Sequence, residues 1–234
     1  MLHRYKSPMV EGGNASVGEY RAEKMDIKKI GREKVRSLFI SLFLKLDSLY
    51  KKRYKKPLWD NTSDISSGKV FTGSSRYLFD QNISDEEYVK YKQITGDIDI
   101  AVDRNKILKL HDLLNNHLGS QIVPNVEYVG DTKAMMVSQD GQINCIFRVS
   151  DGINRVNVQV DFEGAKYENG SPSDFATFSH SSDWEDIKDG FKGVAHKFLL
   201  RALAKAVAPV KSFILLTPTS AFERPRNLNV SNCF

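Results

Sequence analysis

The sequence predicts an α+β protein in which a mixed, largely antiparallel sheet is flanked by helices. Apolar residues recur every three or four positions over 26–54 and 107–118, which is the spacing of amphipathic helices. Between residues 126 and 162 the period changes to two, and Asp-Gly pairs interrupt the alternating runs, as in strands joined by tight hairpins. The two periods together indicate helices packed on a sheet.

The composition is that of an ordinary globular chain. Its 234 residues are 41% hydrophobic and 27% charged, which suits one core. No apolar run is long enough to span a bilayer, and no hydrophobic stretch follows the basic start, so we expect a soluble, cytoplasmic protein. Cys145 and Cys233 lie far apart, which suggests neither a disulfide scaffold nor a zinc site.

One domain is expected over residues 26–234, after an irregular arm over 1–25 with little periodicity. Its N-terminal helix lies within 26–60 and is stopped by Pro57. One face of this helix is apolar, and it carries Val35, Leu38, Phe39, Leu42, Leu46 and Leu49.

Two longer helices are expected further along the chain. The one over 107–118 is closed by Gly119, a residue suited to a helix C-terminus. An extra C-terminal helix over 182–208 opens with a capping box, in which Glu185 follows Ser182 by three residues.

The sheet is expected within residues 69–163. A short strand over 69–73 is followed by a polar segment, 80–95, that holds one short helix inside a loop, and then by a strand that starts at Asp97. The other strands are expected in four alternating runs, the last three forming an antiparallel meander: VEYVG, TKAMMVS, INCIFRVS and RVNVQVDF.

Positive charge is concentrated in one segment. The chain carries a formal net charge of +5, and the segment from Lys51 to Lys56 holds five of its basic residues. Such a patch attracts polyanions such as RNA by Coulomb attraction and counterion release. It is equally typical of the solvated end of a surface helix.

Two aspartates stand side by side in the strand GDIDIAVD. Alternation sends Asp97 and Asp99 to one face and the intervening apolar residues to the other. Adjacent carboxylates repel each other unless a cation lies between them, and a divalent metal is the usual solution. The alternative is a solvent-facing edge strand whose polar face is acidic.

A third aspartate, Asp161, stands on the polar face of the strand VNVQVDF. Three carboxylates from two neighbouring strands can hold two metal ions, and hard oxygen ligands favour Mg²⁺ or Mn²⁺ over zinc. Asp161 could instead cap a turn before Gly164.

The segment Gly73-Ser74-Ser75 ends the strand over 69–73. A glycine at a strand end lets backbone N–H groups approach a ligand, and the two hydroxyls add donors, which together suit a phosphate. Turns also use these residues commonly, so the position of the segment, between a strand and the Asp-Ile-Asp strand, gives it weight.

These residues resemble the signature of the nucleotidyltransferase superfamily typified by DNA polymerase beta, poly(A) and CCA-adding polymerases and antibiotic nucleotidyltransferases. The matching elements are Thr72-Gly73-Ser74, Asp97-Ile98-Asp99 and Asp161, and the resemblance covers Lys69 to Phe162. The interval from Gly73 to Asp97 is longer than the family's common spacer. We therefore expect residues 80–95 to be an insertion that leaves Gly73 beside the aspartates.

The resemblance implies a polymerase beta-type fold with its catalytic core over 69–163. It also implies a two-metal, NTP-dependent enzyme that transfers NMP from an NTP to a hydroxyl acceptor and releases pyrophosphate. The metal-holding, catalytic residues would be Asp97, Asp99 and Asp161. The nucleotide would be bound by Gly73, Ser74 and Ser75 and neutralised by Arg76, Lys192 or Lys197.

The basic segment Lys51 to Lys56 makes RNA, such as a tRNA end, the expected acceptor, while a protein or a small molecule stays open. Two other functions also stay open. One is a non-catalytic nucleotidyltransferase-like module that binds nucleic acid or protein. The other is an α+β binding protein whose aspartates hold a structural calcium.

Overall fold

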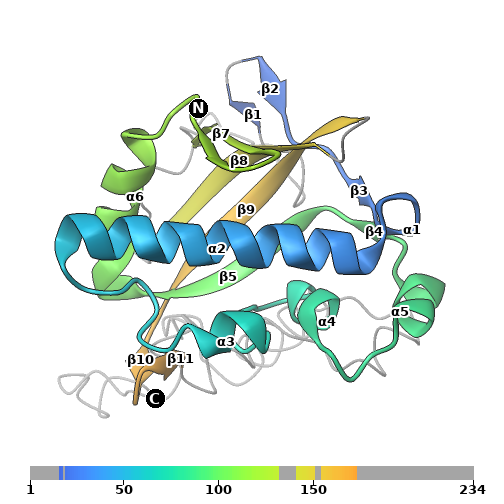
Figure 1. The fold of residues 1–234 in the computed structure, drawn as a ribbon, viewed down its shortest axis with the longest axis horizontal. Helices are drawn as coiled ribbons and strands as arrows, with labels where there is room; N and C mark the ends of the chain where they lie inside the picture. The colour runs from blue at the N-terminus through green and yellow to red at the C-terminus, as the bar shows by residue number, and fades with distance from the viewer. Residues whose placement is uncertain (1–15, 18, 132–140, 151–153, 173–234) are drawn as a thin grey trace, which may run out of the picture.

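The computed structural model describes residues 16–17, 19–131, 141–150 and 154–172, which form helices flanking a five-stranded sheet (Figure 1). The strand order is β5-β9-β8-β7-β6; β5 and β9 run parallel, and the other neighbours are antiparallel. The predicted α+β class with a mixed, largely antiparallel sheet is therefore confirmed. The strands are β5 (Asp97–Asp103), β6 (Gln121–Val123), β7 (Val126–Asp131), β8 (Gln142–Ser150) and β9 (Arg155–Ala165).

The meander follows the alternating runs in the sequence. β7 pairs with β8, and β8 pairs with β9 along its whole length, from Gln142 opposite Glu163 to Ser150 opposite Arg155. The short strand β6 was not predicted, because three residues are too few to show a period. The strand expected in TKAMMVS, 132–138, lies outside the described residues, as does the helix expected over 182–208.

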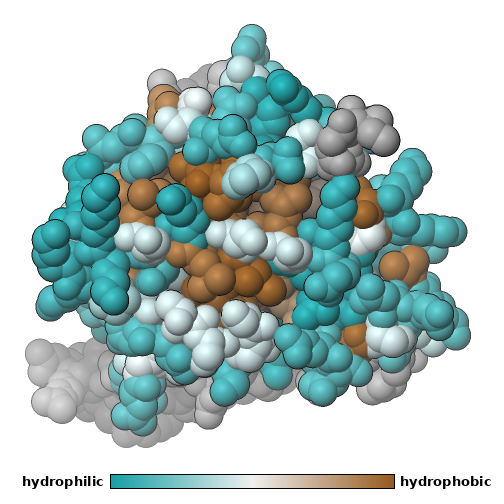
Figure 2. Space-filling view, viewed as in Figure 1, coloured by the Kyte–Doolittle hydropathy of each residue, from teal (hydrophilic) through white to brown (hydrophobic). Residues whose placement is uncertain are grey.

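One long helix covers one face of the sheet (Figure 1). The ring of Phe43, in α2 (Arg32–Tyr54), packs 5.7 Å from Phe71 and 6.1 Å from Phe162. α6 (Ile107–Asn115) joins the same core through Leu110 and Leu114. Figure 2, drawn from the same side, shows hydrophobic residues gathered in the middle of the molecular surface, with hydrophilic residues around them.

The predicted N-terminal helix is divided. α1 (Ile27–Ile30) is followed by Gly31, whose φ of 91° breaks the helix before α2 begins. The helix expected within 26–60 is therefore represented by α2, with the separate short helix α1 before it. α2 ends at Tyr54, because Lys55 adopts a left-handed conformation ahead of Pro57.

The arm expected to be irregular over 1–25 forms short strands in its described part. These are β1 (Ser16–Val17), β2 (Tyr20–Arg21) and β3 (Met25–Asp26), and β3 pairs with β4 (Ile94–Thr95). Two-residue strands carry no readable alternation, so no sequence pattern indicates them.

The connections are mostly short helices. The one helix expected inside 80–95 is confirmed as α5, while the strand expected over 69–73 is reduced to a bridge between Phe71 and Ile100. Within the described ranges, no helix has the length and apolarity needed to cross a membrane. The remaining elements are α3 (Ser63–Ser66), α4 (Ser75–Phe79), α5 (Asp85–Tyr91), η1 (Arg104–Lys106), β10 (Tyr167–Glu168) and β11 (Ser171–Pro172).

A buried arginine connects α2 to α4, to α5 and to the segment between them. Arg32 is 2% exposed, donates hydrogen bonds to four backbone carbonyls, and pairs with Asp85 at 3.0 Å. Its guanidinium also lies 4.8 Å from the ring centre of Tyr88. The four carbonyls belong to Tyr77, Leu78, Asp80 and Ile83.

Arg32→Met should therefore lower the free energy of unfolding by about 3–5 kcal/mol, because it leaves several buried carbonyl groups without a hydrogen-bond donor. Urea unfolding measures this change. The matched control is Lys45→Met, at an exposed position of the same helix, which should change stability by less than about 0.5 kcal/mol. Equal effects at both positions would contradict the assigned role of Arg32.

Candidate metal centre

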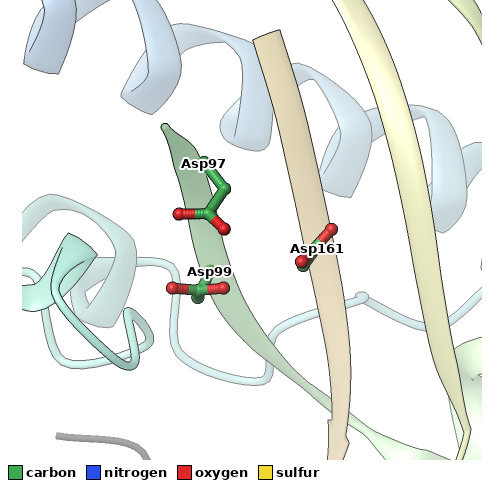
Figure 3. A group of neighbouring side chains, drawn as sticks. All are labelled: Asp97, Asp99 and Asp161. Atoms are coloured by element: carbon green, nitrogen blue, oxygen red, sulfur yellow. The ribbon is translucent and has the colours of Figure 1, made fainter. Parts of the chain in front are cut away.

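Three aspartates meet on the face of the sheet opposite α2. The apolar residues of β5, such as Ile98 and Ile100, pack in the core with α2, so Asp97 and Asp99 project from the other face. The parallel register places Asp99 opposite Asp161 on β9. One carboxylate oxygen from each of the three lies within 4.8 Å of the others (Figure 3).

The three carboxyl groups resist ionisation together. Burial raises the pKa of Asp99 well above its usual value, and the charges of Glu163, Asp97 and Asp161 raise it further. Burial likewise raises the pKa of Asp161 to about 7. The pKa of Asp97 is also raised, chiefly by burial, although the charge of Lys92 opposes this. A cation among these oxygens would favour their ionised form.

Two buried amides hold Asp161. Its Oδ1 accepts hydrogen bonds from Asn144 Nδ2 at 2.8 Å and from Gln159 Nε2 at 2.9 Å. The oxygens of the same two amides, Asn144 Oδ1 and Gln159 Oε1, are buried and have no hydrogen-bond partner among the described residues. Buried amide oxygens next to carboxylates are hard donors, which suits a hydrated divalent cation.

The Gly73 turn lies directly beside β5, as expected. Ala101 N donates to Val70 O at 2.7 Å and Thr72 N donates to Asp99 O at 3.2 Å, so this segment follows the edge of β5 away from β9. Gly73 then turns the chain with a φ of 55°. The backbone N–H groups of Gly73 and Ser74 have no acceptor among the described residues, which leaves two donors in the turn beside β5.

The predicted phosphate-binding side chains differ in position. Ser75 is fully buried, and its Oγ accepts a hydrogen bond from Asp99 N at 2.9 Å, so its hydroxyl positions β5. Ser74 is half-buried and caps no backbone N–H of α4, whereas Arg76 is exposed. The other two candidates, Lys192 and Lys197, lie outside the described residues.

Two charged residues of the site were missed in the sequence. Lys92 follows α5 and interacts electrostatically with Asp97 and Asp99; burial lowers its pKa to about 8. Nothing in the polar segment 80–95 distinguishes Lys92 from its neighbours. Glu163 raises the pKa of all three aspartates. Strand alternation could have identified it, since it follows Asp161 by two residues and therefore lies on the same face of the strand.

The basic segment Lys51 to Lys56 lies at the other end of β5. It forms the last turn of α2 and the residues after it, and Arg53 pairs with Asp112 of α6 at 2.8 Å. α6 follows the C-terminal end of β5, whereas Asp97 and Asp99 stand at its N-terminal end. An acceptor that contacts both regions would therefore have to extend along the length of the strand.

Known proteins add no further evidence. No protein-family model, no curated protein and no solved structure matches the chain.

Proposed function

We propose that this protein is a metal-dependent nucleotidyltransferase of the polymerase beta type, which transfers NMP from an NTP to a hydroxyl acceptor and releases pyrophosphate. The observation that carries the proposal is the parallel register of β5 and β9. It gathers the carboxylates of Asp97, Asp99 and Asp161, while the Gly73 turn runs along the other edge of β5.

The donor set fits a hard divalent cation. Opposite ligand oxygens around one such ion lie about 4 Å apart for Mg²⁺ and about 5 Å apart for Ca²⁺. The three carboxylate oxygens here lie within 4.8 Å of one another. The nearby amide oxygens are further hard donors. Asp97, Asp99 and Asp161 would hold Mg²⁺ or Mn²⁺, which when bound would polarise the triphosphate and lower the pKa of the attacking hydroxyl.

The chain's own groups account for triphosphate binding. The N–H groups of Gly73 and Ser74, which have no acceptor within the described ranges, would form a phosphate cradle, and Lys92 supplies positive charge close to Asp97 and Asp99. Held in this way, the α-phosphorus is open to in-line attack, and pyrophosphate is the leaving group. Positioning and charge stabilisation provide most of the rate enhancement in such transfers.

RNA is the proposed acceptor, on the basis of the exposed basic segment Lys51 to Lys56. Because this segment lies at the far end of β5, RNA would contact both ends of the strand. Replacing Lys51, Lys52 and Lys56 with glutamine should then weaken RNA binding and reduce its salt dependence, with little effect on triphosphate binding.

The experiment is a transfer assay. The full chain is incubated with each α-labelled ribonucleoside triphosphate, Mg²⁺ or Mn²⁺, and total RNA, and label is followed in RNA and in protein, together with released pyrophosphate. Metal-dependent label in RNA supports the proposal, and label in protein would change the acceptor. If no label is transferred but RNA is bound, the site belongs to a non-catalytic binding module.

A further inference from the structure

A fourth carboxylate beside the triad holds the Gly73 turn in place. Glu163 Oε2 accepts a hydrogen bond from Thr72 Oγ1 at 2.6 Å, although the two residues are far apart in the sequence. Thr72 lies along one edge of β5 and Glu163 lies on β9, at the other edge. The Glu163 side chain must therefore cross the face of β5 to reach Thr72.

The sequence of β5 leaves room for this crossing. Glu163 stands opposite Ala101, whose methyl group is the smallest side chain on this face of the strand. A longer side chain at position 101 would lie in the path between Glu163 and Thr72. This face of β5 and β9 therefore combines the long carboxylate acceptor of Glu163, the small side chain of Ala101 that it passes, and the hydroxyl donor of Thr72 that it reaches.

The position of Glu163 is electrostatically unfavourable for the metal-free site. Its charge raises the pKa of Asp97, Asp99 and Asp161, yet the group of oxygens within 4.8 Å consists of those three aspartates. Glu163 instead accepts the short hydrogen bond from Thr72, and hydrogen bonds to a charged acceptor are strong.

This bond completes a two-sided support for the turn. Thr72 and Ser75 flank Gly73 and Ser74, and both are buried, at 1% and 0% exposure. Ser75 Oγ binds Asp99 N, while Thr72 binds Asp99 O through its backbone and Glu163 through its side chain. The N–H groups of Gly73 and Ser74, which find no acceptor in the part of the chain that the structure describes, are thereby fixed relative to the aspartates.

We propose that Glu163 is a positioning residue for the triphosphate, acting through Thr72 to hold the Gly73 turn at the metal centre. This inference rests on the proposed nucleotidyltransferase function. It assigns Glu163 to the phosphate cradle, not to the metal ligands. Loosening the turn should weaken triphosphate binding and leave binding of the metal alone nearly intact.

The test compares Thr72→Val, which removes the hydroxyl, with Thr72→Ser, which keeps it. Binding of ATP, GTP, CTP and UTP with Mn²⁺ is measured by calorimetry, and binding of Mn²⁺ alone by electron paramagnetic resonance. T72V should weaken triphosphate binding about tenfold, the effect of losing one hydrogen bond to a charged group, and change Mn²⁺ affinity less than about threefold. T72S should restore most of the triphosphate affinity.

Glu163→Gln and Glu163→Ala separate hydrogen bonding from charge. The glutamine oxygen can still accept from Thr72, so E163Q should retain more triphosphate affinity than E163A, and combining E163A with T72V should add little to either change.

Three results would overturn the inference. Unchanged triphosphate affinity in T72V, even with a lower unfolding temperature, would make the bond merely structural. Loss of Mn²⁺ affinity in E163Q as large as that in Asp161→Asn, with T72V unaffected, would make Glu163 a metal ligand. Absence of Mn²⁺-dependent triphosphate binding in the unmodified protein would instead overturn the proposed function, and the inference with it.

Discussion

Asp99→Asn should reduce metal-dependent nucleotidyl transfer by about a thousandfold or more and also raise the unfolding temperature of the metal-free protein. Asp99 stands at the centre of the triad, opposite Asp161 and two residues from Asp97. A bound metal contributes several kcal/mol of charge stabilisation, which corresponds to this loss of rate. The stability gain follows because a neutral amide removes repulsion between buried carboxylates.

The stability gain should be about 1 kcal/mol or more, which is about 2–4 °C in a chain of this size. Pyrophosphate release measures the activity, and a thermal melt in chelator measures the stability. Asp103→Asn is the matched control, since Asp103 lies on the same strand and face but four residues beyond Asp99. It should keep the transfer rate within about threefold. Equal loss of activity in both variants would show that the effect is not specific to the triad.

Affinity for Mg²⁺ or Mn²⁺ should rise steeply with pH up to about 7. Metal ligands must be deprotonated, and the pKa of Asp161 is raised to about 7 while that of Asp99 is raised well above its usual value. Below pH 7 the metal must displace a proton, so its affinity should fall about tenfold for each pH unit per proton released. Calorimetry in buffers of different ionisation enthalpy measures both the affinity and the number of protons.

The stability of the metal-free protein should show the opposite trend. The folded pKa of Asp161 lies above its unfolded value, so the folded state binds the proton more tightly. The contribution of protonated Asp161 to the stability of the folded state is therefore complete below about pH 4 and is lost as pH rises toward 7. Saturating Mn²⁺ should reverse this loss, and its stabilising effect should be larger at pH 8 than at pH 5.5. Proton-independent metal binding would contradict the ionisation states derived for the triad.

Strand alternation was sufficient to predict the acidic side of the site. It placed Asp97 and Asp99 on one face of β5 and Asp161 on the polar face of β9, and the structure brings the three together. The same rule selects Glu163, but the family signature ends at the third acidic residue, so Glu163 was passed over. The parallel pairing of β5 with β9 has no local signal, because it joins segments separated by the whole meander.

The role of a hydroxyl near the turn was harder to predict. Ser74 and Ser75 look alike in the sequence, but Ser75 is buried against the backbone of β5 and Ser74 is half-buried at the turn. Which of two hydroxyls binds the protein's own backbone depends on the path of α4, and that path is fixed by distant contacts such as those of Arg32. Lys92 was missed for the same reason, since α5 and the pairing of β4 with β3 set its position.

The most direct test of the metal centre is an electron paramagnetic resonance titration of Mn²⁺ at pH 8, with the unmodified protein and with the Asp97→Asn/Asp99→Asn variant. We expect saturable Mn²⁺ binding by the unmodified protein, tighter in the presence of a nucleoside triphosphate and lost in the variant. Equal binding by both proteins, or none by either, would contradict the assignment of Asp97, Asp99 and Asp161 as a metal site.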